Sequence, residues 1–164
     1  MVAAKEFHTP CQERVYWQVK GYLDELVEEH FDDAEHCDFY LKYGTTVVEV
    51  SIEPYEEDDA VVQVLAFCVQ GVQPTYELTS ELLRLNSELQ LGAFSLVDSD
   101  IFYSHSFLGR ELQPDQLLAS LDNVASVSDD YDEKIVAKYG GETAIQRLRG
   151  ARKTGEQSSQ ANLR

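Results

Sequence analysis

Two neighbouring segments alternate apolar and polar residues with the period of a β-strand. Positions 37–43 and 46–53 both follow this pattern, and Gly44 lies between them. A period of two predicts a strand with one buried and one solvated face. The acidic stretch at positions 54–59 is typical of a loop. The apolar positions expected to face helices are Phe39, Leu41, Val48, Val50 and Ile52.

Positions 60–72 are apolar on both faces of the strand they predict. One face would carry Val61, Leu65, Phe67 and Val69, and the other Val62, Val64, Ala66 and Cys68. A strand of this kind needs cover on both faces. We expect the second cover to come from a subunit interface or from a long C-terminal helix that wraps the sheet.

Three segments have the helical period of 3.6 residues. The first begins at Thr9-Pro10 and ends near His30, the second runs from Thr75 to Gly92 with a stripe of leucines, and the third spans positions 114–139. Strands at 92–97 and 101–108 separate the last two helices. The pattern predicts an α+β domain, with one antiparallel sheet of about five strands packed against helices in the order α-β-β-β-α-β-β-α.

The formal charge of −17 is unevenly distributed along the 164 residues. Eight of the thirteen basic residues and 29 of the thirty acids precede position 147, which gives residues 1–146 a charge of −21. Residues 147–164 carry +4 and resemble a disordered tail. We therefore expect one domain over residues 1–146. A body this acidic repels phosphates, which argues against nucleic acid and anionic membrane as partners.

The cellular compartment is indicated by the cysteines and by the start of the chain. The sequence has an odd number of cysteines, Cys11, Cys37 and Cys68, and it shows no apolar leader or membrane-spanning stretch. The three cysteines are best interpreted as reduced thiols on apolar faces. We expect a cytoplasmic protein.

Two groups of residues could carry chemistry. His30, Asp32, Asp33, His36 and Cys37 include metal-ligand types, but their spacing matches no closed four-ligand site. His105 lies among aromatic residues in its strand, where it is either a core histidine with a hydroxyl or backbone partner or a polar anchor in a groove. No phosphate loop or nucleophile motif is present. We expect no cofactor, no metal and no enzymatic activity. The alternative is a small enzyme or metal-dependent protein that uses His105 or the His30–Cys37 cluster.

The order of elements and four short motifs resemble a known family. The motifs are Leu83-Arg84-Leu85-Asn86-Ser87-Glu88-Leu89, Gly92-Ala93-Phe94, Phe107-Leu108-Gly109-Arg110 and Tyr131-Asp132-Glu133-Lys134-Ile135-Val136. Together they are similar to the YbjN-domain proteins, and their sequence most closely resembles a cyanobacterial branch of unknown function. That family is related in fold to the chaperones of type III secretion. The resemblance implies a bacterial α+β homodimer that holds segments of client proteins, and it supplies no catalytic residues.

These observations predict a symmetric homodimer that captures segments of other proteins. The prediction is based on apolar surface in excess of what three helices can cover, because exposed patches of that size usually mark interfaces. The residues expected to form the binding groove or the dimer surface are Val61, Leu65, Phe67, Ile101, Tyr103, His105 and Phe107.

Overall fold

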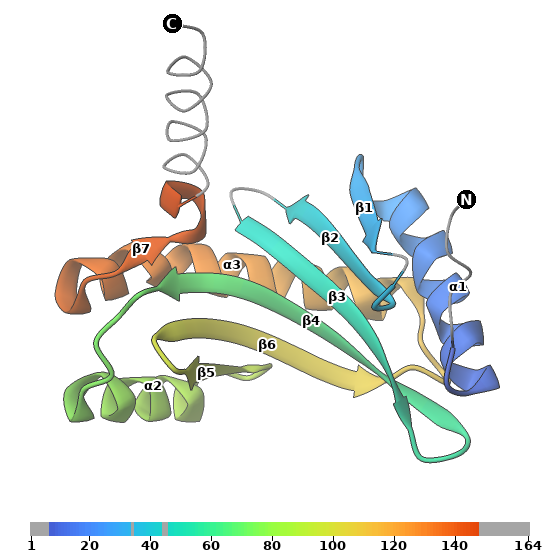
Figure 1. The fold of residues 1–164 in the computed structure, drawn as a ribbon, viewed down its shortest axis with the longest axis horizontal. Coiled ribbons are helices and arrows are strands. Elements are labelled where there is room, and N and C mark those ends of the chain that lie inside the picture. Colours follow the sequence, from blue (N-terminus) through green and yellow to red (C-terminus); the bar gives the residue numbers. More distant parts are fainter. Residues whose placement is uncertain (1–6, 34, 44–45, 148–164) are drawn as a thin grey trace, which may run out of the picture.

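Figure 1 shows the chain folded into one curved sheet with helices packed against it. The structure is a computed structural model that describes residues 7–33, 35–43 and 46–147. The predicted basic tail lies outside the described residues from position 148 onward. In the described part the elements follow in the order α1 (Pro10–Leu26), β1 (His30–Asp33), β2 (Asp38–Tyr43), β3 (Thr46–Tyr55), β4 (Asp59–Gln70), α2 (Tyr76–Glu88), β5 (Ala93–Val97), β6 (Asp100–Leu108), α3 (Pro114–Tyr139) and β7 (Glu142–Thr143).

The strands lie side by side in the order β1-β2-β3-β4-β6-β5, and β7 pairs with the end of β4. Every described pairing is antiparallel. The predicted α+β class and antiparallel sheet are therefore confirmed. The strand count is higher than the five expected, because β1 and β7 are too short to show a period. β7 depends on Gly141, where a Cβ atom would meet the Gln70 carbonyl oxygen at 2.7 Å.

The hairpin between β3 and β4 corrects a predicted boundary. Positions 54–59 were expected to form a loop, but Pro54 pairs with Ala60 and the turn is confined to positions 56–58. β2 pairs with β3 only as far as Ser51. Beyond Ser51 that side of β3 has no strand neighbour among the described residues, and this leaves room for a proline that lacks an amide hydrogen.

Helix α1 begins where its capping residues predict. The Thr9 side chain accepts a hydrogen bond from the Gln12 amide at 3.0 Å, and Pro10 occupies the first turn. The Gln12 side chain accepts from the His8 amide at 2.8 Å and donates to the Ile52 carbonyl at 2.9 Å. This buried amide therefore fixes the start of α1 against β3.

Helices α2 and α3 contact each other at the C-terminal end of α3. Glu81 of α2 accepts hydrogen bonds from Lys138, at 2.5 Å, and from the Tyr139 hydroxyl. The predicted leucine stripe is buried at Leu78, Leu82 and Leu85. With 26 residues, α3 is about 39 Å long and contacts β2, β3, β4 and β6.

The main core lies between the helices and one face of the sheet. The side chains predicted to face the helices have at most 3% exposure, and they are Phe39, Leu41, Val48, Val50 and Ile52. The register of β4 against β6 shifts between Phe67 and Val69. This bulge buries both Cys68 and Val69. The expectation that Val69 shares a face with Val61 was therefore wrong.

Candidate functional site

One face of the central strands has no helix against it in the described part of the chain. In β4 the even positions from 60 to 68 are buried, and the odd positions from 61 to 67 are only half-buried. Strand β3 alternates in the same way. Helices α1 and α3 account for the buried side through their contacts with β3 and β4 (Figure 1). The alternative that the C-terminal helix supplies the second cover is wrong, because α3 lies on the buried side of β3 and β4.

The opposite side, here called the uncovered face, has an apolar half along β4 and β6. Register aligns Val61 with Leu108, Leu65 with Ser104 and Phe67 with Phe102. The Phe67 and Phe102 rings meet edge to face with centroids 5.4 Å apart. Leu108 is 51% exposed. The remaining residues of this half are the neutral Gln63 and Ser106.

The seven predicted site residues do not form one surface. Val61, Leu65 and Phe67 lie on the uncovered face, but Ile101, Tyr103, His105 and Phe107 lie on the helix-covered side. Register explains the division, because His105 pairs with the buried Val64. Ile101 and Tyr103 have 0% exposure and belong to the core. Sequence alternation shows which residues of one strand share a face, but it does not show the register of its neighbour.

His105 is a half-buried histidine on the helix-covered side with a hydroxyl partner. Its Nδ1 atom lies 2.9 Å from the Ser120 Oγ atom of α3, and its ring packs against Phe107 at 5.5 Å. Burial lowers the pKa of His105, which keeps the ring neutral near pH 7. Ser120 has 1% exposure, so a substrate has no access to its oxygen. This serine–histidine contact therefore offers no hydrolytic site.

The two histidines of the His30–Cys37 cluster contact separate carboxylates. His30 Nε2 lies 2.7 Å from Asp24, and His36 Nδ1 lies 3.1 Å from Asp33. Cys37 is buried. Among the described residues, no three His, Cys, Asp or Glu side chains are grouped closely enough to hold a metal ion. The sequence cluster is thus divided between β1 and the turn that follows it.

The second half of the uncovered face is acidic, and sequence reasoning did not identify it. Asp38 of β2 and Glu49 and Glu53 of β3 project from this side, and Tyr40 is the cross-strand partner of Glu49. Partial burial, reinforced by Glu49 and Glu53, raises the pKa of Asp38 to about 6. Burial also raises the pKa of Glu49, and it raises that of Tyr40 to about 12. These three carboxyl groups, here called the acidic strip, could have been found only once the pairing of β2 with β3 was known.

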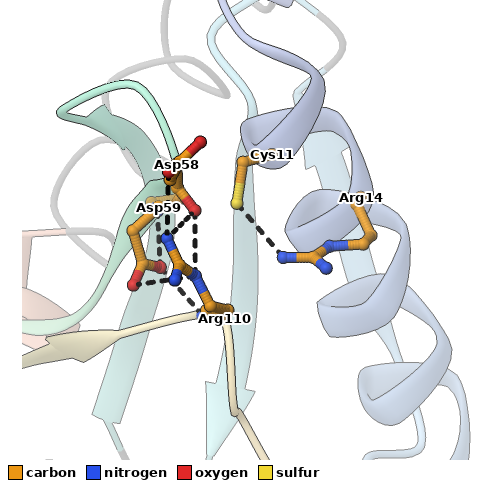
Figure 2. A network of polar contacts seen from close by, with 6 residues as sticks. Cys11, Arg14, Asp58, Asp59 and Arg110 are labelled. Atoms are coloured by element: carbon orange, nitrogen blue, oxygen red, sulfur yellow. Dashed lines mark hydrogen bonds and ion pairs between the residues drawn. The ribbon is translucent and has the colours of Figure 1, made fainter.

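A pocket of about 530 Å³ lies between the start of α1 and the β3–β4 turn. Figure 2 shows Arg110 enclosed by Asp58 and Asp59, with Arg14 directed at Cys11. Arg110 donates to the Asp58 carbonyl at 3.0 and 2.5 Å, and Arg14 lies 3.2 Å from the Cys11 sulfur. Asp58 and Asp59 neutralise the charge of Arg110. The contact between Arg110 and the Asp58 carbonyl holds the β3–β4 turn against the end of β6.

The outer edge of β5 is closed by a side chain. The Asn86 amide accepts from the Phe94 N–H at 2.7 Å and donates to the Phe94 carbonyl at 3.0 Å. It thereby satisfies both backbone groups of Phe94, which a further strand would otherwise use at that position. Covering an edge in this way discourages strand addition.

Comparison with known proteins agrees with the predicted resemblance. The model of the TY-Chap1 family, described as "T3SS (YopN, CesT) and YbjN peptide-binding chaperone 1", matches residues 13–147. The solved structure of YbjN from E. coli aligns with a TM-score of 0.52 at 13% identity, covering 73% of this chain and 92% of that chain. No curated protein matches. No described helix is long and apolar enough to cross a membrane. The chain belongs to the T3SS and YbjN peptide-binding chaperone family.

Proposed function

We propose that this protein is a non-catalytic, chaperone-like or regulatory binding protein that holds segments of partner proteins on its uncovered face. The observation that carries the proposal is the apolar half of that face, where Val61, Leu65, Phe67 and Phe102 lie without a covering helix. Membership of a peptide-binding family supports the same role. An extended segment placed there would bury its apolar side chains against β4 and β6.

The test uses fluorescein-labelled peptides of twelve residues in which every second residue is Leu. The intervening residues are all Lys, all Asn or all Glu in three separate peptides. Fluorescence anisotropy with the full-length chain reports binding. We expect at least one peptide to bind, and we expect its affinity to fall at least tenfold in the double variant Leu65→Ser/Phe67→Ser.

The matched control for this double variant is Leu91→Ser, because Leu91 is 44% exposed and lies outside the strands. This control should leave binding unchanged. If none of the three peptides binds, or if the control weakens binding as much as the double variant does, the proposed face is wrong.

We also propose a symmetric homodimer in which the outer side of α2 forms the contact. Tyr76 and Leu83 are seven residues apart on one side of α2 and are 82% and 71% exposed. Pairing through the uncovered face would instead bury the acidic strip of both copies, which is costly for unpaired carboxylates. Light scattering should give a dimer at tens of micromolar and a monomer for Leu83→Asp. A monomeric wild-type protein would contradict the dimer, and dissociation by Leu65→Asp alone would contradict the assignment to α2.

We propose a cytoplasmic location for this function. Cys11, Cys37 and Cys68 are all free thiols, and reduced cysteines are typical of cytoplasmic proteins. Fractionation of the native cells with an antibody to the protein tests this location. Recovery with secreted or envelope proteins would contradict it.

A further inference from the structure

We propose that the partner segment is basic as well as apolar, and that the acidic strip of Asp38, Glu49 and Glu53 selects it. This inference rests on the proposed function, because it specifies the chemistry of the segment held on the uncovered face. The occupant is a segment with Leu-like side chains on one side and Lys or Arg on the other.

The register places the acidic strip directly beside the apolar half of the uncovered face. Glu49 is the cross-strand partner of Leu65, and Glu53 is the partner of Val61. Neighbouring strands lie about 4.8 Å apart, so each carboxylate stands one strand spacing from an apolar side chain. Asp38 lies one strand further out, opposite Ser51. A segment that runs edge-on along the boundary between β3 and β4 can therefore direct one row of side chains to the apolar half and the opposite row to the acidic strip.

Charge is segregated on this face. The β4 and β6 positions that line it include no charged side chain between Val61 and Phe67 or between Phe102 and Leu108. Among the described strands, Lys42 is the one Lys or Arg residue, and it lies on this face opposite Val47, diagonal to Glu49. Three carboxylates therefore share this face with one base of the described strands, and a bound Lys or Arg side chain would supply further counter-charge.

The closeness of the carboxyl groups in the acidic strip destabilises the folded chain. The pKa of Asp38 is raised first by burial and then by Glu49, Glu53 and Asp33, with His36 acting weakly in the opposite direction. Like charges at neighbouring cross-strand positions destabilise a sheet. A cation at this position would relieve the repulsion. A second copy of the chain would bring the same acids, and a nucleic acid would bring phosphates, so neither complements the strip.

The experiment uses the same three peptides with the full-length chain at one fixed salt concentration. The Leu/Lys peptide should bind at least tenfold more tightly than the Leu/Asn peptide, and the Leu/Glu peptide should bind most weakly. In the variant Asp38→Asn/Glu49→Gln, the preference for Lys over Asn should fall at least fivefold. Both substitutions remove repulsion, so the variant is expected to fold.

A basic peptide could also be attracted by the net negative charge of the whole protein. A control variant that removes two negative charges outside the acidic strip distinguishes this effect from selection by the strip. Glu25 on α1 and Asp130 on α3 are exposed residues of the helices that cover the other side. The variant Glu25→Gln/Asp130→Asn should keep the preference for the Leu/Lys peptide. An equal loss of preference in both double variants would overturn the inference, because it would show that only the net charge acts.

The outcomes also separate this inference from the proposed function. If the Leu/Asn peptide binds as tightly as the Leu/Lys peptide and both depend on Leu65 and Phe67, the face holds segments but the acidic strip selects nothing. The basic residues of the chain after position 146 are a competing occupant. A chain truncated after residue 147 should show the same peptide preference. Loss of that preference on truncation would overturn the inference.

Discussion

Replacing Asp38 by Asn should stabilise the folded protein at neutral pH. The pKa of this carboxyl group is raised from 3.8 to about 6 in the folded state. Each unit of pKa corresponds to about 1.4 kcal/mol, so the full shift would correspond to about 3 kcal/mol. The side chain is partly exposed and solvent screens its interactions, which reduces the expected gain for Asp38→Asn to about 1 kcal/mol. That gain would raise the Tm by about 2–4 °C in a chain of this size.

The sign of the pH dependence follows from the raised pKa. Between about pH 4 and pH 6 the folded state binds more protons at Asp38 than the unfolded state does, so stability falls as the pH rises through this window. The penalty is complete above about pH 6 and absent below about pH 4. Asp38→Asn should therefore be more stable than wild type at pH 7.5 and equal to it near pH 4.

Urea unfolding followed by circular dichroism at pH 7.5, 6.0, 5.0 and 4.0 measures this difference. Glu25→Gln serves as the control, because Glu25 is exposed on α1 and lies outside the acidic strip. An Asp38→Asn protein that is less stable than wild type at pH 7.5 would refute the reasoning. So would a stability difference that grows toward acid pH.

Three further substitutions test the packing. Leu85→Ala should lower the free energy of unfolding by about 2–5 kcal/mol in urea titrations, because Leu85 is 4% exposed and its loss leaves a cavity; a change below 1 kcal/mol would contradict a buried stripe. Gly92→Ala should lower the free energy of unfolding by more than about 1 kcal/mol, since φ is 70° and the new Cβ atom meets a backbone oxygen at 2.6 Å. Gly21→Ala, on the open side of α1, should be neutral or stabilising. Equal effects of the two substitutions would contradict the steric argument. Asn86→Ala should speed hydrogen exchange at the Phe94 amide, and unchanged exchange would show that the Asn86 side chain does not protect the β5 edge.

The helices were predictable because their signals are local. Thr9 with Pro10 starts α1, Thr75 accepts from the Leu78 amide at the start of α2, and Gly140 ends α3 at a φ of 78°. These residues act through the backbone within a few positions, so a single sequence contains the full signal. The alternation in β2 and β3 is equally local, and it correctly identified the buried side of each strand.

The candidate site was less predictable because it depends on pairing between distant segments. The alternation of β4 and of β6 was visible in the sequence, but register decides that Leu65 lies beside Ser104 rather than beside His105. The bulge after Phe67 adds one residue that no local pattern indicates. The acidic strip joins residues of two strands in the same way. In the sequence, Glu49 and Glu53 occupy the polar positions of an alternating strand. This pattern is the same as that of an ordinary solvent-exposed surface.

The most direct test of the account follows the methyl groups of the protein by NMR while the Leu/Lys peptide is added. The account predicts chemical-shift changes concentrated at Val61, Leu65 and Leu108, which lie on the uncovered face. Methyl groups at Leu91, and at Leu83 on the outer side of α2, should not respond. Shifts confined to Leu83, Leu91 and the surface of the helices, with the uncovered face unaffected, would contradict the central claim.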